Sequence, residues 1–370
     1  MGKGKTISQL PREITLNILA RLPVKSLLRS KCVCKPWRTL ISDPQFAKLQ
    51  LTQSQKHSYI NPNRILLSCD PPLSIDYEAY NGGEDDSKVI TTQLEYPSAL
   101  EEFVVDLVGS CHGLVCLLLD DGGQFIIWNP CTGESRALPK PNSVPDGTFS
   151  YGLGYDFLTD DYKLLRVGSS CSSDVEVFTL KTNVWRRSSD LQQGIELNGN
   201  GIFLNGSLHF LATQVSGPTK IKVIVSFNLA QEKIEEVVAV PDHLQEKDDA
   251  VLGVSGDCFC IFFSDYSADL YEGWVMKEFG VKSSWTRLFS NPIEPFPGYK
   301  YWQNALCYTK SGKVVIDHDG WELLLYDPKE QTIKNFAIEY EDHYFHPIIY
   351  SESLVSPNFD DAAANGENPV

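Results

Sequence analysis

The chain has 370 residues, 42% of them hydrophobic, and a formal net charge of -16. This length allows about two domains. Charge is unevenly divided, since residues 1–51 hold ten Lys/Arg against two Asp/Glu and residues 52–370 hold 22 against 46. A groove that tracks phosphates needs clustered Lys/Arg, so the acidic larger part argues against nucleic acid as a partner. No run of eighteen apolar residues occurs, and we therefore expect no membrane span.

The N-terminal segment 10–51 has the clearest local pattern, LPREITLNILARLPVKSLLRSKCVCKPWRTLISDPQFAKLQL. Proline suits the first turn of a helix and cannot continue one, so its prolines predict three short helices. We expect them over about 11–21, over 24–33, and from 36 to a stop at Asp43-Pro44. Forty residues cannot bury this many apolar side chains by themselves. The segment is therefore predicted to dock another protein.

These residues resemble the F-box, the helical module that attaches substrate receptors to the Skp-type adaptor of SCF (cullin–RING) ubiquitin ligases. The resemblance rests on Leu10-Pro11, on the run from Ile18 to Arg29, and on Lys35-Pro36-Trp37. It implies an acidic adaptor, for which the basic segment is electrostatically suited. The alternative is an amphipathic helical subdomain packed on its own protein. The residues expected to contact the adaptor are Leu10, Pro11, Ile14, Ile18, Leu19, Leu22, Pro23, Val24, Leu27, Leu28, Cys32, Val33 and Trp37.

From about residue 64 onward, short β-rich runs bounded by Gly, Asn, Asp and Ser predict an all-β domain. Similar hairpins recur along it, and their marker positions step by 50, 49, 51 and 48 residues. Between the hairpins lie strands around tight turns such as Asn205-Gly206 and Ser311-Gly312, where glycine supplies a positive φ. A period of about 49 residues with four strands predicts a propeller of about six blades. The markers are Trp128, Phe178, Phe227, Glu278 and Tyr326.

The first repeat is degenerate, with candidate strands at 64–69, 73–77 and 89–94. Closure of the ring could therefore combine strands from both ends of the chain. The expected fold is α+β, a three-helix F-box followed by the propeller-like domain. The expected divisions are an extension at 1–9, the F-box at 10–51, a linker at 52–63, the β-domain at 64–355 and a disordered tail at 356–370.

The β-domain resembles the F-box-associated domain of plants, a relative of kelch propellers. The resemblance rests on Cys111-His112-Gly113-Leu114 with the WNPCTG run at 128–133, on Gly154-Tyr155-Asp156, and on Val184-Trp185-Arg186. Together the two resemblances imply a non-catalytic SCF subunit. It would bind the adaptor, and through it cullin and RING subunits, and would hold a client protein for ubiquitination and proteasomal degradation.

Two other functions are open. The first is a scaffold that binds the Skp adaptor without turnover of a client. The second is a kelch-type propeller enzyme, although the sequence has no nucleophile elbow, no GxxxxGK phosphate loop and no HExxH.

The client surface is less determined by the sequence than the F-box. An acidic domain favours a basic client. Aromatic residues in strand connections are candidate contacts, because Tyr and Trp dominate interface energetics, but they could equally be blade packing. The candidates are Tyr266, Tyr271, Trp274, Tyr299, Tyr301 and Trp302.

The ten cysteines are expected to be reduced thiols in a cytoplasmic or nuclear protein, because no secretory signal precedes residue 10. No pair of CxxC knuckles occurs, so we expect no structural zinc and no cofactor. Two polar groups, His343/His346 and Asp317-His318-Asp319, are expected to be surface or strand-end residues. The first residues fit the loose myristoylation pattern at Gly2, but this pattern is too short to establish that modification.

Overall fold

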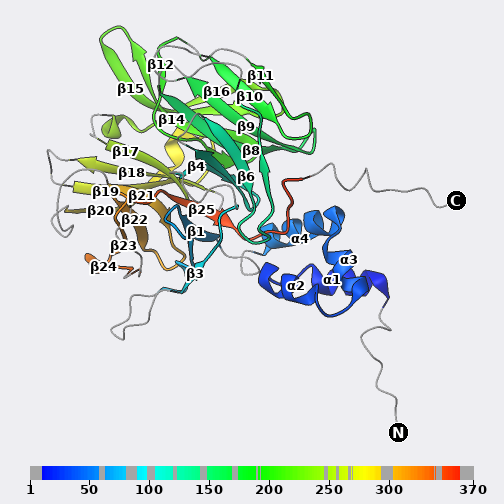
Figure 1. Cartoon of the computed structure of the whole chain (residues 1–370). Helices are drawn as coiled ribbons and strands as arrows, with labels where there is room; N and C mark the ends of the chain where they lie inside the picture. The colour runs from blue at the N-terminus through cyan, green and yellow to red at the C-terminus, as the bar shows by residue number, and fades with distance from the viewer. Residues whose placement is uncertain are drawn as a thin grey trace.

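The computed structural model describes residues 11–57, 63–80, 90–97, 105–119, 123–141, 148–168, 174–188, 191, 193–245, 249–255, 258–265, 268, 270–292, 303–336, 338 and 344–358. Its N-terminal part is helical and the remainder is built from strands (Figure 1). In the described residues no helix is long and apolar enough to cross a membrane.

Among the described residues the helical part contains four helices, one more than the three predicted. They are α1 (Arg12–Leu19), α2 (Val24–Ser30), α3 (Lys35–Ile41) and α4 (Pro44–Lys56). The Asp43-Pro44 pair that ends α3 also begins α4, because the Asp43 carboxylate accepts a hydrogen bond from the Gln45 amide at 2.8 Å. Helix α4 continues through residue 56, past the start of the predicted linker.

The described strands form six blades. Five sheets are present in the described residues, and the largest is two four-stranded blades joined by one parallel pairing, Val254 with Cys307. The first blade consists of β25 (Pro347–Ser351), β1 (Asn63–Leu67), β2 (Leu73–Ile75) and β3 (Thr91–Gln93). The second consists of β4 (Val105–Cys111), β5 (Leu114–Leu119), β6 (Gln124–Trp128) and β7 (Ser135–Ala137).

The other four blades follow in chain order. The third contains β8 (Phe149–Asp156), β9 (Asp161–Gly168), β10 (Val175–Thr179) and β11 (Val184–Arg187). The fourth contains β12 (Ile195–Leu197), β13 (Ile202–Leu204), β14 (Ser207–Ser216), β15 (Thr219–Asn228) and β16 (Lys233–Ala239). The fifth contains β17 (Asp249–Ser255), β18 (Cys258–Asp265), β19 (Leu270–Met276) and β20 (Trp285–Pro292). The sixth contains β21 (Gln303–Tyr308), β22 (Val314–His318), β23 (Glu322–Asp327) and β24 (Thr332–Asn335).

Contacts between the innermost strands close the blades into a ring, from β25 through β4, β8, β13, β17 and β21 back to β25. The predicted propeller of about six blades is therefore confirmed. Four of the five sequence markers lie in or at the end of a blade's third strand, and their aromatic side chains are buried. Glu278 falls two residues beyond β19. The repeat of about 49 residues is thus the spacing of third strands.

The first blade joins the two ends of the β-domain, as the degenerate first repeat suggested. Strand β25 pairs antiparallel with β1, with Ile349 opposite Ile65. Beneath this pairing, the Arg64 Nε donates to the Ser74 hydroxyl at 2.6 Å, and that hydroxyl lies 2.7 Å from the hydroxyl of Tyr350. All three side chains are buried, so polar contacts as well as the backbone ladder hold the last strand.

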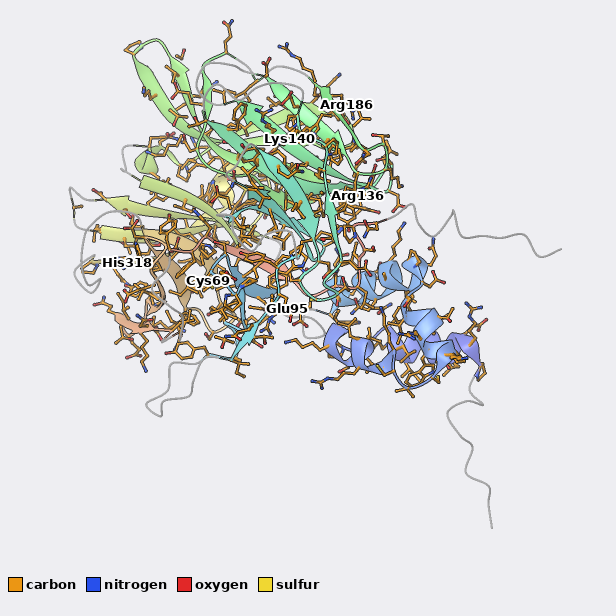
Figure 2. All side chains as sticks on the ribbon, viewed as in Figure 1. Cys69, Glu95, Arg136, Lys140, Arg186 and His318 are labelled. Atoms are coloured by element: carbon orange, nitrogen blue, oxygen red, sulfur yellow. The ribbon has the colours of Figure 1, made fainter. Side chains whose placement is uncertain are left out.

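The ring has two faces. The helix-side face carries the turns between first and second strands, such as 112–113, 157–160 and 205–206, and α4 lies against it (Figure 1). The far face carries the turns between second and third strands, such as 319–321. His318, at the end of β22, lies on the side of the ring away from the helices (Figure 2). A partner on each face would therefore be separated by the thickness of the ring.

Replacing Gly113 with Ala should destabilise the closed ring. Gly113 has φ +84°, and a Cβ there would lie 2.3 Å from the Ser353 hydroxyl and 2.8 Å from the Ser351 carbonyl. Gly123 is the matched control, with φ +70° and nothing within 4 Å of a Cβ. Both variants incur the left-handed cost of about 1–2 kcal/mol, and Gly113→Ala should lose a further ~1–3 kcal/mol from overpacking. Urea unfolding measures the difference, and equal losses would contradict this packing.

Candidate protein-docking surfaces

The helical module has a small core of its own. Leu19, Val24, Leu27, Ile41 and Phe46 are each at most 2% exposed and pack together. Three of them, Leu19, Val24 and Leu27, were predicted to contact the adaptor. This prediction is corrected, because the short helices use these side chains to hold one another. A spacing of four residues defines a stripe but does not say which neighbour covers it.

A second apolar set of the module is open to solvent. Ile14 and Ile18 lie one turn apart on α1 and are 45% and 50% exposed, and Val33, just after α2, is 66% exposed. Burial of such a side chain against a partner would stabilise the complex by roughly 1.5–3 kcal/mol. The other predicted contacts differ in burial. The exposed ones are Pro11, Pro23 and Cys32, and the half-buried ones are Leu22, Leu28 and Trp37. Leu10 lies outside the described residues.

The open apolar set is accompanied by cations. Arg12, Arg21, Arg29, Lys35 and Arg38 are all exposed. Such a surface attracts an acidic partner during encounter and disfavours a basic one. The exposed apolar side chains of the same module supply contact area.

The module is attached to the ring by the segment that follows β25. The Asn129 side chain is fully buried, and its Nδ2 donates to the Ser353 carbonyl at 3.1 Å and to the Val355 carbonyl at 2.7 Å. Its Oδ1 accepts from the Cys131 amide at 2.8 Å. Leu354, between the two anchored carbonyls, packs into the core of the helices. One asparagine therefore fixes the segment that both parts share.

Ion pairs add to this attachment. Glu352 is nearly buried, and its carboxylate lies 3.5 Å from the Lys25 Nζ of α2 and 3.6 Å from the Arg64 Nε of β1. Lys48 of α4 pairs with Asp160 in the turn after β8. Burial works against ionisation of Asp160, but the hydrogen bonds from Lys48 and Tyr155 lower the pKa of its carboxyl. The ring thus contacts α4 and the start of α2, and leaves Ile14, Ile18 and Val33 open to solvent.

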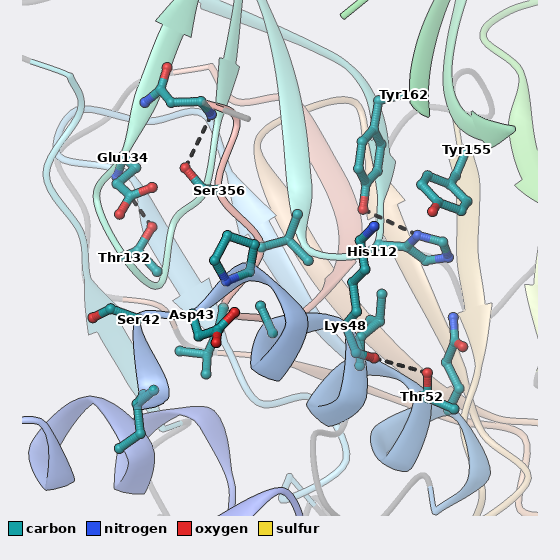
Figure 3. Close-up of a pocket in the computed structure, with 18 of the residues that line it drawn as sticks. Ser42, Asp43, Lys48, Thr52, His112, Thr132, Glu134, Tyr155, Tyr162 and Ser356 are labelled. Atoms are coloured by element: carbon teal, nitrogen blue, oxygen red, sulfur yellow. Dashed lines mark hydrogen bonds between the residues drawn. The ribbon is translucent and has the colours of Figure 1, made fainter. Parts of the chain in front are cut away.

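A pocket of about 280 Å³ remains between α4 and the helix-side face. In Figure 3, His112, Tyr155 and Tyr162 form a wall from the ring, with Lys48 and Thr52 of α4 nearby. The His112 Nδ1 lies 3.3 Å from the Tyr162 hydroxyl. Burial lowers the pKa of His112 to about 4 and raises that of Tyr162, so both are neutral near pH 7. Two neutral rings that pack against each other suit a structural contact better than acid–base catalysis.

Potential metal ligands are scattered over the part of the chain that is described. It contains no group of three or more His, Cys, Asp or Glu able to hold a metal ion. Its nine cysteines are free thiols, and burial raises the pKa of Cys116 and Cys307. His318 pairs with Glu322 at a strand end, and His343 lies outside the described residues.

The predicted client contacts are mostly not surface residues or not described. Tyr271 is 1% exposed inside its blade, so its assignment as a surface contact was wrong. Trp274 is partly buried against the core of the same blade. Tyr266, Tyr299, Tyr301 and Trp302 lie outside the described residues. The exposed aromatics of the described residues include Trp321 and Tyr344, at 47% and 52%, which the sequence did not single out.

Comparison with known proteins agrees with this division of the chain. Residues 7–49 match the F-box domain, and residues 67–357 match the F-box associated beta propeller domain. The chain belongs to the plant F-box proteins with this propeller domain. F-box protein At3g07870 of Arabidopsis thaliana is 27% identical, over 96% of this chain and 93% of the relative. F-box protein CPR1 of the same plant is 28% identical, over 94% and 88%. F-box/kelch-repeat protein At3g23880 of the same plant is 31% identical, over 76% and 79%.

Replacing Asn129 with Ala should loosen the F-box from the propeller. The change leaves two buried carbonyls unpaired, which costs about 1–3 kcal/mol. Asn228 is a matched control, because it ends β15 as Asn129 follows β6, and its Oδ1 caps its own turn at 2.9 Å from the Ala230 amide. Hydrogen exchange of residues 352–356 should accelerate in Asn129→Ala and not in Asn228→Ala. Unchanged exchange in both would show that Asn129 does not anchor the segment.

Proposed function

We propose that this F-box protein is the substrate-recognition subunit of an SCF E3 ubiquitin ligase. Its F-box binds a Skp-type adaptor, and through it cullin and RING subunits, and its propeller binds a client for ubiquitination and proteasomal degradation. The observation that supports this most directly is the solvent exposure of Ile14, Ile18 and Val33 on a basic module. In this proposal the chain itself performs no bond chemistry and acts in the cytoplasm or nucleus.

The buried attachment of the F-box supports a positioning role. Ubiquitin transfer from a loaded enzyme requires a client lysine to be held near the thioester, and a rigid receptor raises the effective concentration of the two. Asn129 and Glu352 lie in a buried junction and restrict hinge motion between the module and the ring. A flexible linker would hold the client over a broader range of distances.

Charges placed on the open set of α1 should abolish adaptor binding. In Ile14→Asp/Ile18→Asp, two carboxylates would be desolvated at the interface without partners, and affinity for a plant Skp-type adaptor should fall on the order of 100-fold or more. The unfolding midpoint should not change, because both side chains are exposed.

Leu158→Asp is the matched control for this variant. Leu158 is an 81% exposed aliphatic residue of the propeller. Isothermal titration calorimetry compares the wild type and both variants. Wild-type affinity in the α1 variant, or equal loss in the control, would argue against docking through this face.

Degradation of a client separates the receptor from a scaffold. In plant cells with the proteasome inhibited, proximity labelling from the wild-type protein should enrich ubiquitinated proteins, and labelling from Ile14→Asp/Ile18→Asp should enrich the same proteins without ubiquitin. This follows because the propeller is unaltered while the route to the ligase is removed. Neighbours with the same ubiquitination in both cases would favour the non-degradative scaffold.

A further inference from the structure

We propose that the far face of the propeller carries a recognition site for an arginine or lysine side chain of the client, formed by the rings of Trp321 and Tyr344 and the carboxylates of Asp319 and Asp106. This inference rests on the proposed receptor function, because it assigns the client-binding surface of that receptor. The occupant is a basic peptide segment of another protein.

Three rings form a continuous row on this face, and two of them, Trp321 and Tyr344, are exposed while His346 is half-buried. The centroids of Trp321 and Tyr344 lie 6.1 Å apart at 71°, and those of Tyr344 and His346 lie 4.9 Å apart at 83°. The Nε2 of His346 lies 2.9 Å from the Asp106 carboxylate at the start of β4. Two blades and the segment before β25 therefore contribute to one surface. Edge-to-face packing of this kind keeps part of each ring open to a partner.

The row stands on a fixed platform. The Phe345 amide donates to the Gly320 carbonyl at 2.9 Å, and the Phe345 side chain is fully buried between the exposed Tyr344 and the half-buried His346. The His346 amide donates to the Ser68 hydroxyl at 2.7 Å. Gly320 has φ +71°, and a Cβ there would lie 2.3 Å from the Tyr344 ring, so only glycine lets the ring lie over the turn. Side chains held in this way lose little entropy on binding.

The turn itself is also held by a buried carboxylate. The Gly320 amide donates to the Asp317 Oδ1 at 2.9 Å. Asp319, the residue between them, has φ +57° and is exposed. Its carboxylate is therefore available to a ligand beside Trp321, while Asp317 maintains the turn.

Charge selects the occupant. Burial and the carboxylates of Asp317, Asp319 and Asp106 raise the pKa of Tyr344, which places its ring in a negative field. The hydrogen bond between His346 and Asp106 raises the pKa of the imidazole, against the effect of burial. A guanidinium or ammonium over an aromatic face is attracted by the ring, and adjacent carboxylates add to this attraction. An acidic segment would be repelled by the same field.

The test uses a random peptide library displayed on phage, selected against the full-length protein bound to the Skp-type adaptor. We expect the selected peptides to share a position enriched in Arg or Lys. Recovery of those phage should fall at least about tenfold in Trp321→Ala/Tyr344→Ala. Phe279→Ala is the matched control, because Phe279 is an exposed aromatic in the turn between β19 and β20 on the helix-side face, and recovery there should be unchanged.

A second variant keeps the proposal testable if the double alanine variant unfolds. Asp319→Asn preserves the left-handed turn, which asparagine tolerates, and removes one exposed charge. It should lower recovery about threefold, and added salt should lower wild-type recovery in the same direction. Failure to select peptides, selected peptides without basic enrichment, or recovery that is insensitive to these variants would overturn the inference.

Adaptor affinity measured on the same preparations separates the two proposals. If phage recovery does not depend on the far-face residues while adaptor binding is normal, only the client site is overturned. Loss of adaptor binding by the wild-type protein would overturn the receptor function itself.

Discussion

The structure depends on the short segment that follows the last strand. Strand β25 completes the first blade, and the next residues pass beneath Asn129 and place Leu354 in the core of the helices. The Asn129 amide is fully buried, so its hydrogen bonds cannot be replaced by water unless the junction opens. The same few residues therefore close the ring and attach the F-box to it, and neither task is independent of the other.

This junction gives the protein two working ends with opposite chemistry. The F-box presents aliphatic side chains among arginines and lysines, whereas the far face presents aromatic rings among carboxylates. The separation follows the charge asymmetry of the sequence, in which residues 1–51 are basic and the remainder is acidic. Like charges at an interface are unfavourable, so a basic client would be repelled by the basic F-box and attracted by the acidic far face.

Much of this architecture follows from the sequence because a propeller repeats. The spacing of Trp128, Phe178, Phe227 and Tyr326 predicted the blade number, and the degenerate first repeat pointed to closure by both chain ends. Helix α4 was missed because Asp43-Pro44 ends one helix and begins the next. The assignment of Leu19, Val24 and Leu27 failed because periodicity identifies an apolar face without identifying what covers it. The pairing of Trp321 with Tyr344 joins segments 23 positions apart that carry no periodic signal.

The use of β25 in the first blade also has a consequence for the order of synthesis. The F-box helices are synthesised before the ring, but the innermost strand of the blade beside them follows all the other described strands in the chain. An unfinished chain therefore has an open ring with unpaired strand edges and a helical module that lacks its anchor. Emergence of β25 is therefore the step that closes the blades into a ring and anchors the F-box, so products truncated before it are expected to lack the rigid junction that positions a client.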